Sequence, residues 1–144
     1  MAKLLRYSTA LKNTVLDSGI NAVFNSGKLQ IRDGTRPASA DSAPTGTLLA
    51  EIDLPADAFN AASNGSITKS GTWEDLVANN SGTGSWFRMK TTGDDDGNTG
   101  STYPRLDGNV GLVGSTSDLE LNAVAITAGD KLTIDTFTVT LPSA

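Results

Sequence analysis

Beyond residue 27 the sequence is divided into short segments in which apolar and polar residues alternate, and turn-forming residues end each segment. The segment Lys28–Arg32 is typical, because it alternates and then stops at Asp33-Gly34, a pair that favours a tight turn. The chain has 144 residues and 15 glycines, and glycine enters turns of positive φ without steric cost. Segments this short predict a fold made mostly of β-strands.

The number and spacing of these segments predict the fold class. Seven or eight short strands separated by turns favour an antiparallel β-sandwich, of jelly-roll or immunoglobulin-like form, over a parallel α/β fold. The last strand changes phase near Asp135-Thr136, which indicates a β-bulge. Residues 73–77 fit either a strand or a turn. The other strands are predicted at 28–32, 48–54, 66–70, 85–91, 105–113, 119–121 and 131–141.

One segment before residue 27 has a helical period instead. Ser8 or Thr9 can cap a helix that runs over about residues 9–24 and ends at Gly27. We expect its apolar stripe to pack on the sheet rather than to contact a membrane or a partner. The stripe consists of Leu11, Val15, Leu16, Ile20, Val23 and Phe24.

Length and charge limit the organisation and the partners of the chain. A length of 144 residues fits one domain, 1–144. The net charge is -5, with 11 basic residues and no basic cluster, so we expect no nucleic-acid binding. No apolar run approaches membrane-spanning length, and residues 1–6 lack the apolar core of a signal peptide. We therefore expect a soluble protein that is made in the cytoplasm and has no membrane contact.

The sequence contains no cysteine and no histidine. These two residue types supply thiolate nucleophiles, most zinc ligands and the usual general base near neutral pH. Carboxylate pairs for glycoside hydrolysis remain conceivable, but only 8 aromatic residues (2 Trp, 2 Tyr and 4 Phe) are available to line a sugar cleft. We expect a protein that is not an enzyme.

The most polar stretch of the chain, residues 92–102, contains a candidate cation site. Asp94, Asp96 and Asn98 place oxygen donors at alternate positions around Gly97, as the beginning of a Ca²⁺ loop does. No glutamate follows at the distance that completes such a loop. An ordinary solvated turn explains the same residues, and it is the favoured alternative to a calcium cofactor.

Three aromatic residues are candidates for binding. Trp73 and Trp86 could stack on sugar rings, and Tyr103, in the loop at 92–104, is a further candidate contact residue. The competing interpretation places the tryptophans in the core or in a protein interface, where indole side chains are common anchors. Trp86 and Arg88 are predicted on one side of their strand, with Phe87 and Met89 on the other.

Several blocks of sequence, taken together, resemble a family of small virion proteins of tailed bacteriophages. The family has a helix, then a strand that ends in a DGT-x-P loop, then a leucine-rich strand, a small-x-W-F-R strand and an apolar C-terminal strand. The order is kept here, and the stretch 92–104 is longer than in the family pattern. The blocks are Leu11 to Phe24, KLQIRDGTRPASADSA (28–43), TLLAEIDLPADAFNAASNGSIT (47–68), GTGSWFRMK (82–90), LDGNVG (106–111) and SDLELNAVAITAGDKLTIDTFTVTLP (117–142).

The resemblance implies a structural role in the virion. The expected function is that of a capsid decoration or cement protein, which binds the major capsid protein and stabilises its lattice. Such proteins often associate as homo-dimers or homo-trimers. The alternatives are a tail, neck or fibre-attachment component of the same particle and, from another class, a carbohydrate-binding module.

Overall fold

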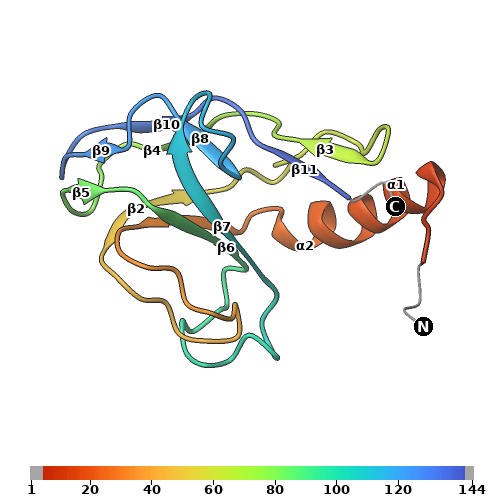
Figure 1. Cartoon of the computed structure of the whole chain (residues 1–144), viewed down its shortest axis with the longest axis horizontal. Coiled ribbons are helices and arrows are strands. Elements are labelled where there is room, and N and C mark those ends of the chain that lie inside the picture. The colour runs from red at the N-terminus through yellow and green to blue at the C-terminus, as the bar shows by residue number, and fades with distance from the viewer. Residues whose placement is uncertain (1–4, 142–144) are drawn as a thin grey trace.

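The computed structural model describes residues 5–141 and is built mainly of β-strands, with one N-terminal helix, as predicted (Figure 1). The ends of the predicted domain, 1–4 and 142–144, lie outside the described residues. The elements are α1 (Thr9–Leu16), η1 (Asp17–Asn21), α2 (Ala22–Phe24), β1 (Lys28–Arg32), β2 (Leu48–Asp53), β3 (Ser66–Thr68), β4 (Trp73–Asp75), β5 (Gly82–Thr83), β6 (Trp86–Lys90), β7 (Arg105–Leu112), β8 (Leu119–Leu121), β9 (Ala125–Ile126), β10 (Leu132–Ile134) and β11 (Thr138–Thr140).

A five-stranded curled sheet in the order β2-β1-β6-β7-β8 forms the body of the molecule. Its centre is the antiparallel pairing of β1 with β6, in which Leu29 lies opposite Met89 and Ile31 opposite Phe87. Because side chains alternate along a strand, these four apolar residues share one face of the sheet. All four are at most 1% exposed, so this face is the floor of the core.

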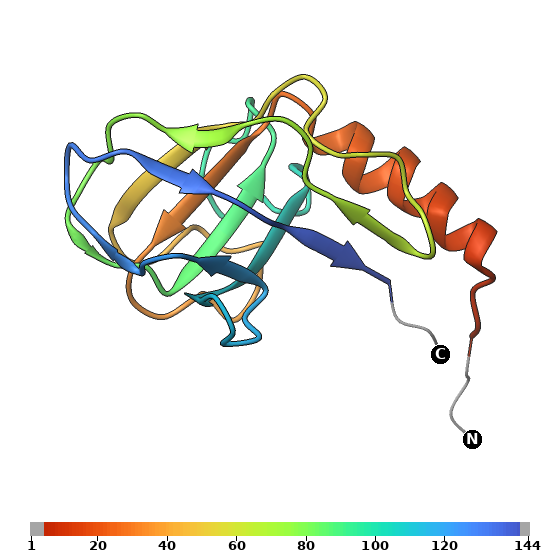
Figure 2. The ribbon, with the colours of Figure 1, turned by 90° about the horizontal axis from the view of Figure 1, so that it is seen from above.

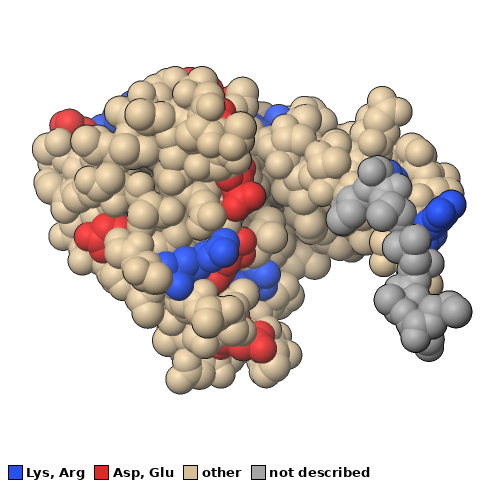
Figure 3. Space-filling view, viewed as in Figure 1, with Lys and Arg blue, Asp and Glu red and all other residues tan. Residues whose placement is uncertain are grey.

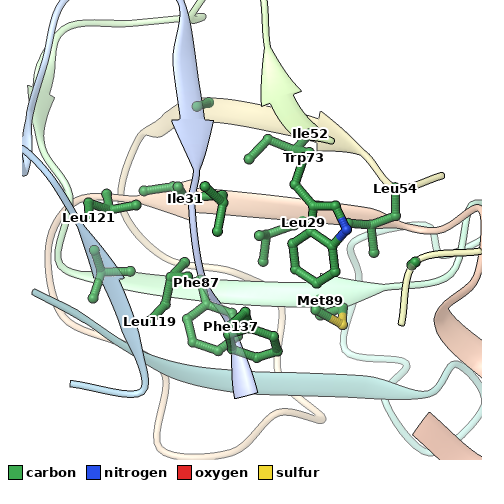
Figure 4. Close-up of a cluster of buried hydrophobic side chains, with 14 of the residues drawn as sticks. Leu29, Ile31, Ile52, Leu54, Trp73, Phe87, Met89, Leu119, Leu121 and Phe137 are labelled. Atoms are coloured by element: carbon green, nitrogen blue, oxygen red, sulfur yellow. The ribbon is translucent and has the colours of Figure 1, made fainter. Parts of the chain in front are cut away.

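Short strands cover that floor in two-stranded pairs, β10 with β4 and β11 with β3 (Figure 2). Trp73 from β4 lies between Phe59 and Phe137, with ring centroids 5.4 Å and 5.7 Å away. Phe137 in turn contacts Phe87 of the main sheet edge-on, at 5.6 Å between centroids. This aromatic chain joins the two layers through the middle of the core (Figure 4).

The predicted antiparallel sandwich of seven or eight strands is not confirmed. Within residues 5–141 there are eleven strands, and the layer facing the main sheet consists of separate pairs. One pairing is parallel, that of β7 with β8. The prediction of a single strand over 131–141 is wrong, because this segment forms two strands, β10 and β11, which pair with different partners. Between them Phe137 turns inward and is 5% exposed, so the phase change at Asp135-Thr136 is a break and not a bulge.

The predicted helix is confirmed over Thr9–Phe24, with the π-helical segment η1 in its middle. Ser8 caps it by accepting a hydrogen bond from the Leu11 N–H at 3.2 Å. The helix ends through Ser26, which has a φ of 59°. Gly27 is needed for a different reason, because a Cβ there would lie 2.5 Å from the Lys90 carbonyl oxygen.

Only half of the helical stripe packs on the body. Leu16 and Phe24 are buried and Ile20 is partly buried. The other three residues are exposed, contrary to the expectation that the whole stripe covers the sheet. Their exposed fractions are 46% for Leu11, 45% for Val15 and 37% for Val23. The helix projects beyond the end of the sheet, and β3 and the segment that leads into it lie beside it (Figures 1 and 2).

Candidate functional site

Two long loops lie against the face of the main sheet that points away from the core. The first long loop (33–47) joins β1 to β2, and the second long loop (91–104) joins β6 to β7. Both loops lie on the same side of the sheet (Figure 1). Every residue of β6 is buried, because the core covers one face of this strand and the loops cover the other. The covered face carries Trp86, Arg88 and Lys90, on the side predicted for Trp86 and Arg88.

Arg88 attaches the first long loop to the sheet. Its Nε and Nη2 atoms donate to the two carboxylate oxygens of Asp107 on β7, at 2.7 and 2.8 Å. Its Nη1 donates to the Ser42 carbonyl oxygen at 2.8 Å. The side chains of Arg88 and Asp107 are 0% and 7% exposed. A two-pronged contact of this kind fixes direction as well as distance, so Ser42 is held in one position.

Arg105 binds both loops at once. Its Nε and Nη2 atoms donate to the Asp94 carboxylate at 2.6 and 2.7 Å, and both side chains are at most 1% exposed. Its Nη1 donates to the carbonyl oxygens of Ala40 and Ser42 at 3.1 and 3.2 Å. Burial raises the pKa of Asp94, but hydrogen bonds from Arg105 and from the Asp96 N–H outweigh it, so the pKa lies below its usual value. The pair is therefore charged at neutral pH.

The loops also touch each other directly. The Gly100 N–H donates to the Asp41 carbonyl oxygen at 3.2 Å, and a Cβ at Gly100 would lie 2.3 Å from the Asp41 Cα. The Ala43 N–H donates to the Asn98 side-chain oxygen at 2.8 Å. We call the two loops, joined in this way, the paired loops. Charged side chains gather between them and the sheet in the lower half of Figure 3.

The three residues of the predicted Ca²⁺ loop are brought into one turn, but their oxygens face groups of the protein. Asp94 faces Arg105, Asp96 forms an ion pair with Lys90 Nζ at 2.7 Å, and Asn98 accepts from Ala43. Among residues 5–141 no group of three or more acidic side chains is placed to hold a metal ion. The arrangement therefore favours the turn interpretation over a calcium site.

The predicted binding role of the two tryptophans does not fit the structure, because neither indole presents a face to solvent. Trp73 is 0% exposed and lies in the core. Trp86 is 1% exposed under the first long loop, where its Nε1–H donates to the Asp33 carbonyl oxygen at 3.2 Å. The Arg88 guanidinium lies 5.5 Å from its ring centroid. Tyr103 is half-buried in the second long loop, and its contact role stays a prediction.

Sequence reasoning did not single out Arg105 or Asp107, and it gave Arg88 no role. One signal was available: β6 alternates polar Arg88 and Lys90 with apolar Phe87 and Met89, so a charged side of that strand was foreseeable. The burial of that side was not foreseeable, because it depends on loops that join other pairs of strands.

No helix among residues 5–141 has the length and apolar character needed to cross a membrane. Comparisons with protein-family models, with curated proteins and with solved structures find no match to this chain.

Proposed function

We propose that the chain is a structural protein of a tailed-bacteriophage virion, a capsid decoration protein that binds the major capsid protein lattice and stabilises it. The observation that carries the proposal is the attachment of the paired loops to the sheet by two buried Arg–Asp pairs. Loops held in this way form a preformed surface that loses little conformational entropy on binding. A protein that spans the joints between capsid subunits needs such a surface.

The two-layer body supports the same function. We infer that the main sheet and the strand pairs opposite it act together as a sandwich, because Trp73, Phe137 and Phe87 join them through the core. A body of this kind transmits load between the subunits it joins, without covalent bonds, because closely packed interiors have low compressibility.

In this proposal the protein lies on the outside of the particle, and its charge supports that location. The net charge of -5 is unfavourable beside packaged DNA, whose phosphates are negative. The proposed location is thus the outer surface of the virion, after synthesis in the host cytoplasm. The proposed partner is the major capsid protein, with self-association into dimers or trimers.

Binding to particles that lack the protein tests the proposal. Purified chain is mixed with particles of the encoding virus prepared without it, and bound protein and heat resistance are measured. We expect saturable uptake and a higher temperature of DNA release. Particles that neither take up the chain nor gain heat resistance would overturn the proposal.

Matched variants test whether the paired loops are the surface that contacts the capsid. Ala38→Arg and Thr102→Arg change exposed positions of the paired loops, and Thr127→Arg changes an exposed position in the loop after β9. We expect the first two variants to weaken uptake at least about tenfold, the effect of 1.4 kcal/mol, and the third to bind as the unmodified chain does. Equal binding by all three would exclude the paired loops as the contact surface.

A further inference from the structure

The exposed side of the N-terminal helix carries no charged residue. Between Thr9 and Phe24 the only charges are Lys12 and Asp17, and both lie toward the β3 segment. Asp17 accepts a hydrogen bond from the Ala62 N–H at 2.8 Å, and Lys12 lies over Gly65. We call the opposite side the uncharged helix face; it consists of Ala10, Leu11, Thr14, Val15, Ser18, Gly19, Ala22 and Val23.

In the sequence these residues form two rows. Leu11, Val15, Gly19 and Val23 follow one another at intervals of four, and a row of small residues from Ala10 to Ala22 runs beside them. In an α-helix such rows drift around the axis, because 3.6 residues make one turn. The π-helical segment η1 has wider turns, so it offsets this drift and keeps both rows on one side.

Gly19 is not needed by the fold of the monomer. Its φ is outside the left-handed region, and a Cβ at this position would meet nothing within 4 Å. Glycine inside a helix nevertheless costs roughly 0.5–1 kcal/mol relative to alanine. The residue is explained if another backbone approaches the helix closely at this point from outside.

We propose that the uncharged helix face binds the same face of a second copy of this chain, with the two helices antiparallel and crossing at Gly19. Val15 and Val23 lie four residues before and after Gly19. An antiparallel crossing at Gly19 therefore places Val15 of each copy against Val23 of the other, which is the self-complementary pattern of a twofold interface.

The charge of the chain favours a second copy as the partner and an antiparallel arrangement of the two helices. Each copy has a net charge of -5, so a contact between two copies is least unfavourable where it brings no like charges together, and the uncharged helix face meets that condition. The body follows the C-terminal end of the helix (Figure 2), and an antiparallel pair therefore holds the two acidic bodies at opposite ends. A membrane surface fits less well, because interfacial helices are rich in exposed lysine and arginine.

Sedimentation of the full chain over a range of concentrations tests the association. We expect the mass to rise from 14.9 kDa towards twice that value. One helix per partner is a small contact, so we expect a dissociation constant in the micromolar range or weaker, on the order of 1 μM to 1 mM. A chain that stays monomeric at about 1 mM, a free energy of only -4.1 kcal/mol, would overturn the proposal.

Substitutions locate the interface. Val15→Lys places a charge at the contact, and we expect the dissociation constant to rise at least about tenfold. Val77→Lys is the control, at a residue that is 65% exposed in the loop after β4, and we expect no change. Gly19→Leu should leave the melting temperature unchanged or raise it, because leucine favours helix, and yet it should abolish dimerisation. Equal weakening by both lysine variants, or dimerisation by Gly19→Leu, would contradict the proposal.

A rescue experiment tests the direction of the helices. In the double variant Val15→Lys with Val23→Glu, an antiparallel pair brings each lysine against a glutamate of the other copy, whereas a parallel pair brings like charges together. We expect the double variant to regain association that Val15→Lys loses. Failure to regain it would refute the antiparallel crossing. The proposed dimer rests on the self-association that the proposed function includes, but the two can fail separately, since dimerisation is measured without particles and uptake by particles is measured apart from it.

Discussion

At the scale of residues, Arg88 shows how strongly the paired loops depend on buried charge. Its guanidinium is fully buried between Asp107 and the Ser42 carbonyl oxygen. Arg88→Met leaves the Asp107 carboxylate without its partner, and breaking a buried pair in this way costs about 3–5 kcal/mol. We expect that loss in the free energy of unfolding, measured with denaturant.

Two further variants show whether the loss in Arg88→Met comes from breaking a buried ion pair. Lys131→Met breaks the exposed pair with Glu74 and should cost less than about 1 kcal/mol. Arg88→Met combined with Asp107→Leu removes both charges and should recover much of the stability. If Arg88→Met cost no more than Lys131→Met, the buried pair would not be holding the loop.

Asp94 makes stability depend on pH. Its pKa is lowered from 3.8 in the folded protein, so the unfolded chain binds a proton more readily, and the stabilisation is present above about pH 4 and is lost as the pH falls further. We expect the unmodified chain to lose stability as the pH falls below about 4. The variant Asp94→Asn should be less stable than the unmodified chain at about pH 7 but should lose less stability in acid. Parallel pH profiles of the two proteins would contradict this role.

The Asp94–Asn98 stretch also shows a limit of sequence reasoning. Alternating oxygen donors around a glycine are shared by calcium loops and by ordinary turns. The deciding contacts come from Arg105, eleven residues away, and from Lys90 on the preceding strand. Neither partner can be identified before the order of strands in the sheet is known.

At the scale of elements, the helix can be divided into a side that stabilises the fold and a side that does not. Leu16 is 0% exposed and Leu11 is 46% exposed. We expect Leu16→Ala to lower the free energy of unfolding by about 2–5 kcal/mol, and Leu11→Ala by less than about 1 kcal/mol. Thermal or denaturant unfolding measures both variants, and equal losses would mean that the helix packs differently.

Local pattern predicted the existence of most elements but not their pairing. The helix and the strands at β1, β2 and β6 followed from periodicity and turn residues, because local sequence determines both. The division of the C-terminal segment at Phe137 depends on a core pocket formed by Trp73 and Phe87, which lie far away in sequence.

The parallel pairing of β7 with β8 could not be predicted from local sequence either. Only six residues, 113–118, separate these strands, although parallel neighbours usually need a connection of a dozen or more. The Glu120 carboxylate makes the short connection feasible by accepting hydrogen bonds from the N–H groups of Gly114 and Thr116, at 3.2 and 3.0 Å. No pattern in the sequence assigns that role to Glu120.

At the scale of the whole molecule, the structure combines three parts: a two-layer body, the paired loops and a projecting helix. We propose that the two-layer body supplies stiffness, that the paired loops bind the capsid, and that the projecting helix binds a second copy; the underlying observations are the aromatic packing, the buried Arg–Asp pairs and the exposed helix side. The sequence predicted a β-rich fold with one helix, but not the paired loops or the exposed helix side, because both depend on which residues are buried. The proposed virion role would use all three parts.

The number of copies per virion tests that account most directly. It is measured by quantifying the chain against the major capsid protein in purified particles. A capsid decoration protein is present in proportion to the capsid lattice, so the account predicts a count that rises with the number of capsid subunits. A count of three, six or twelve per particle would contradict it and would place the chain in the tail or neck.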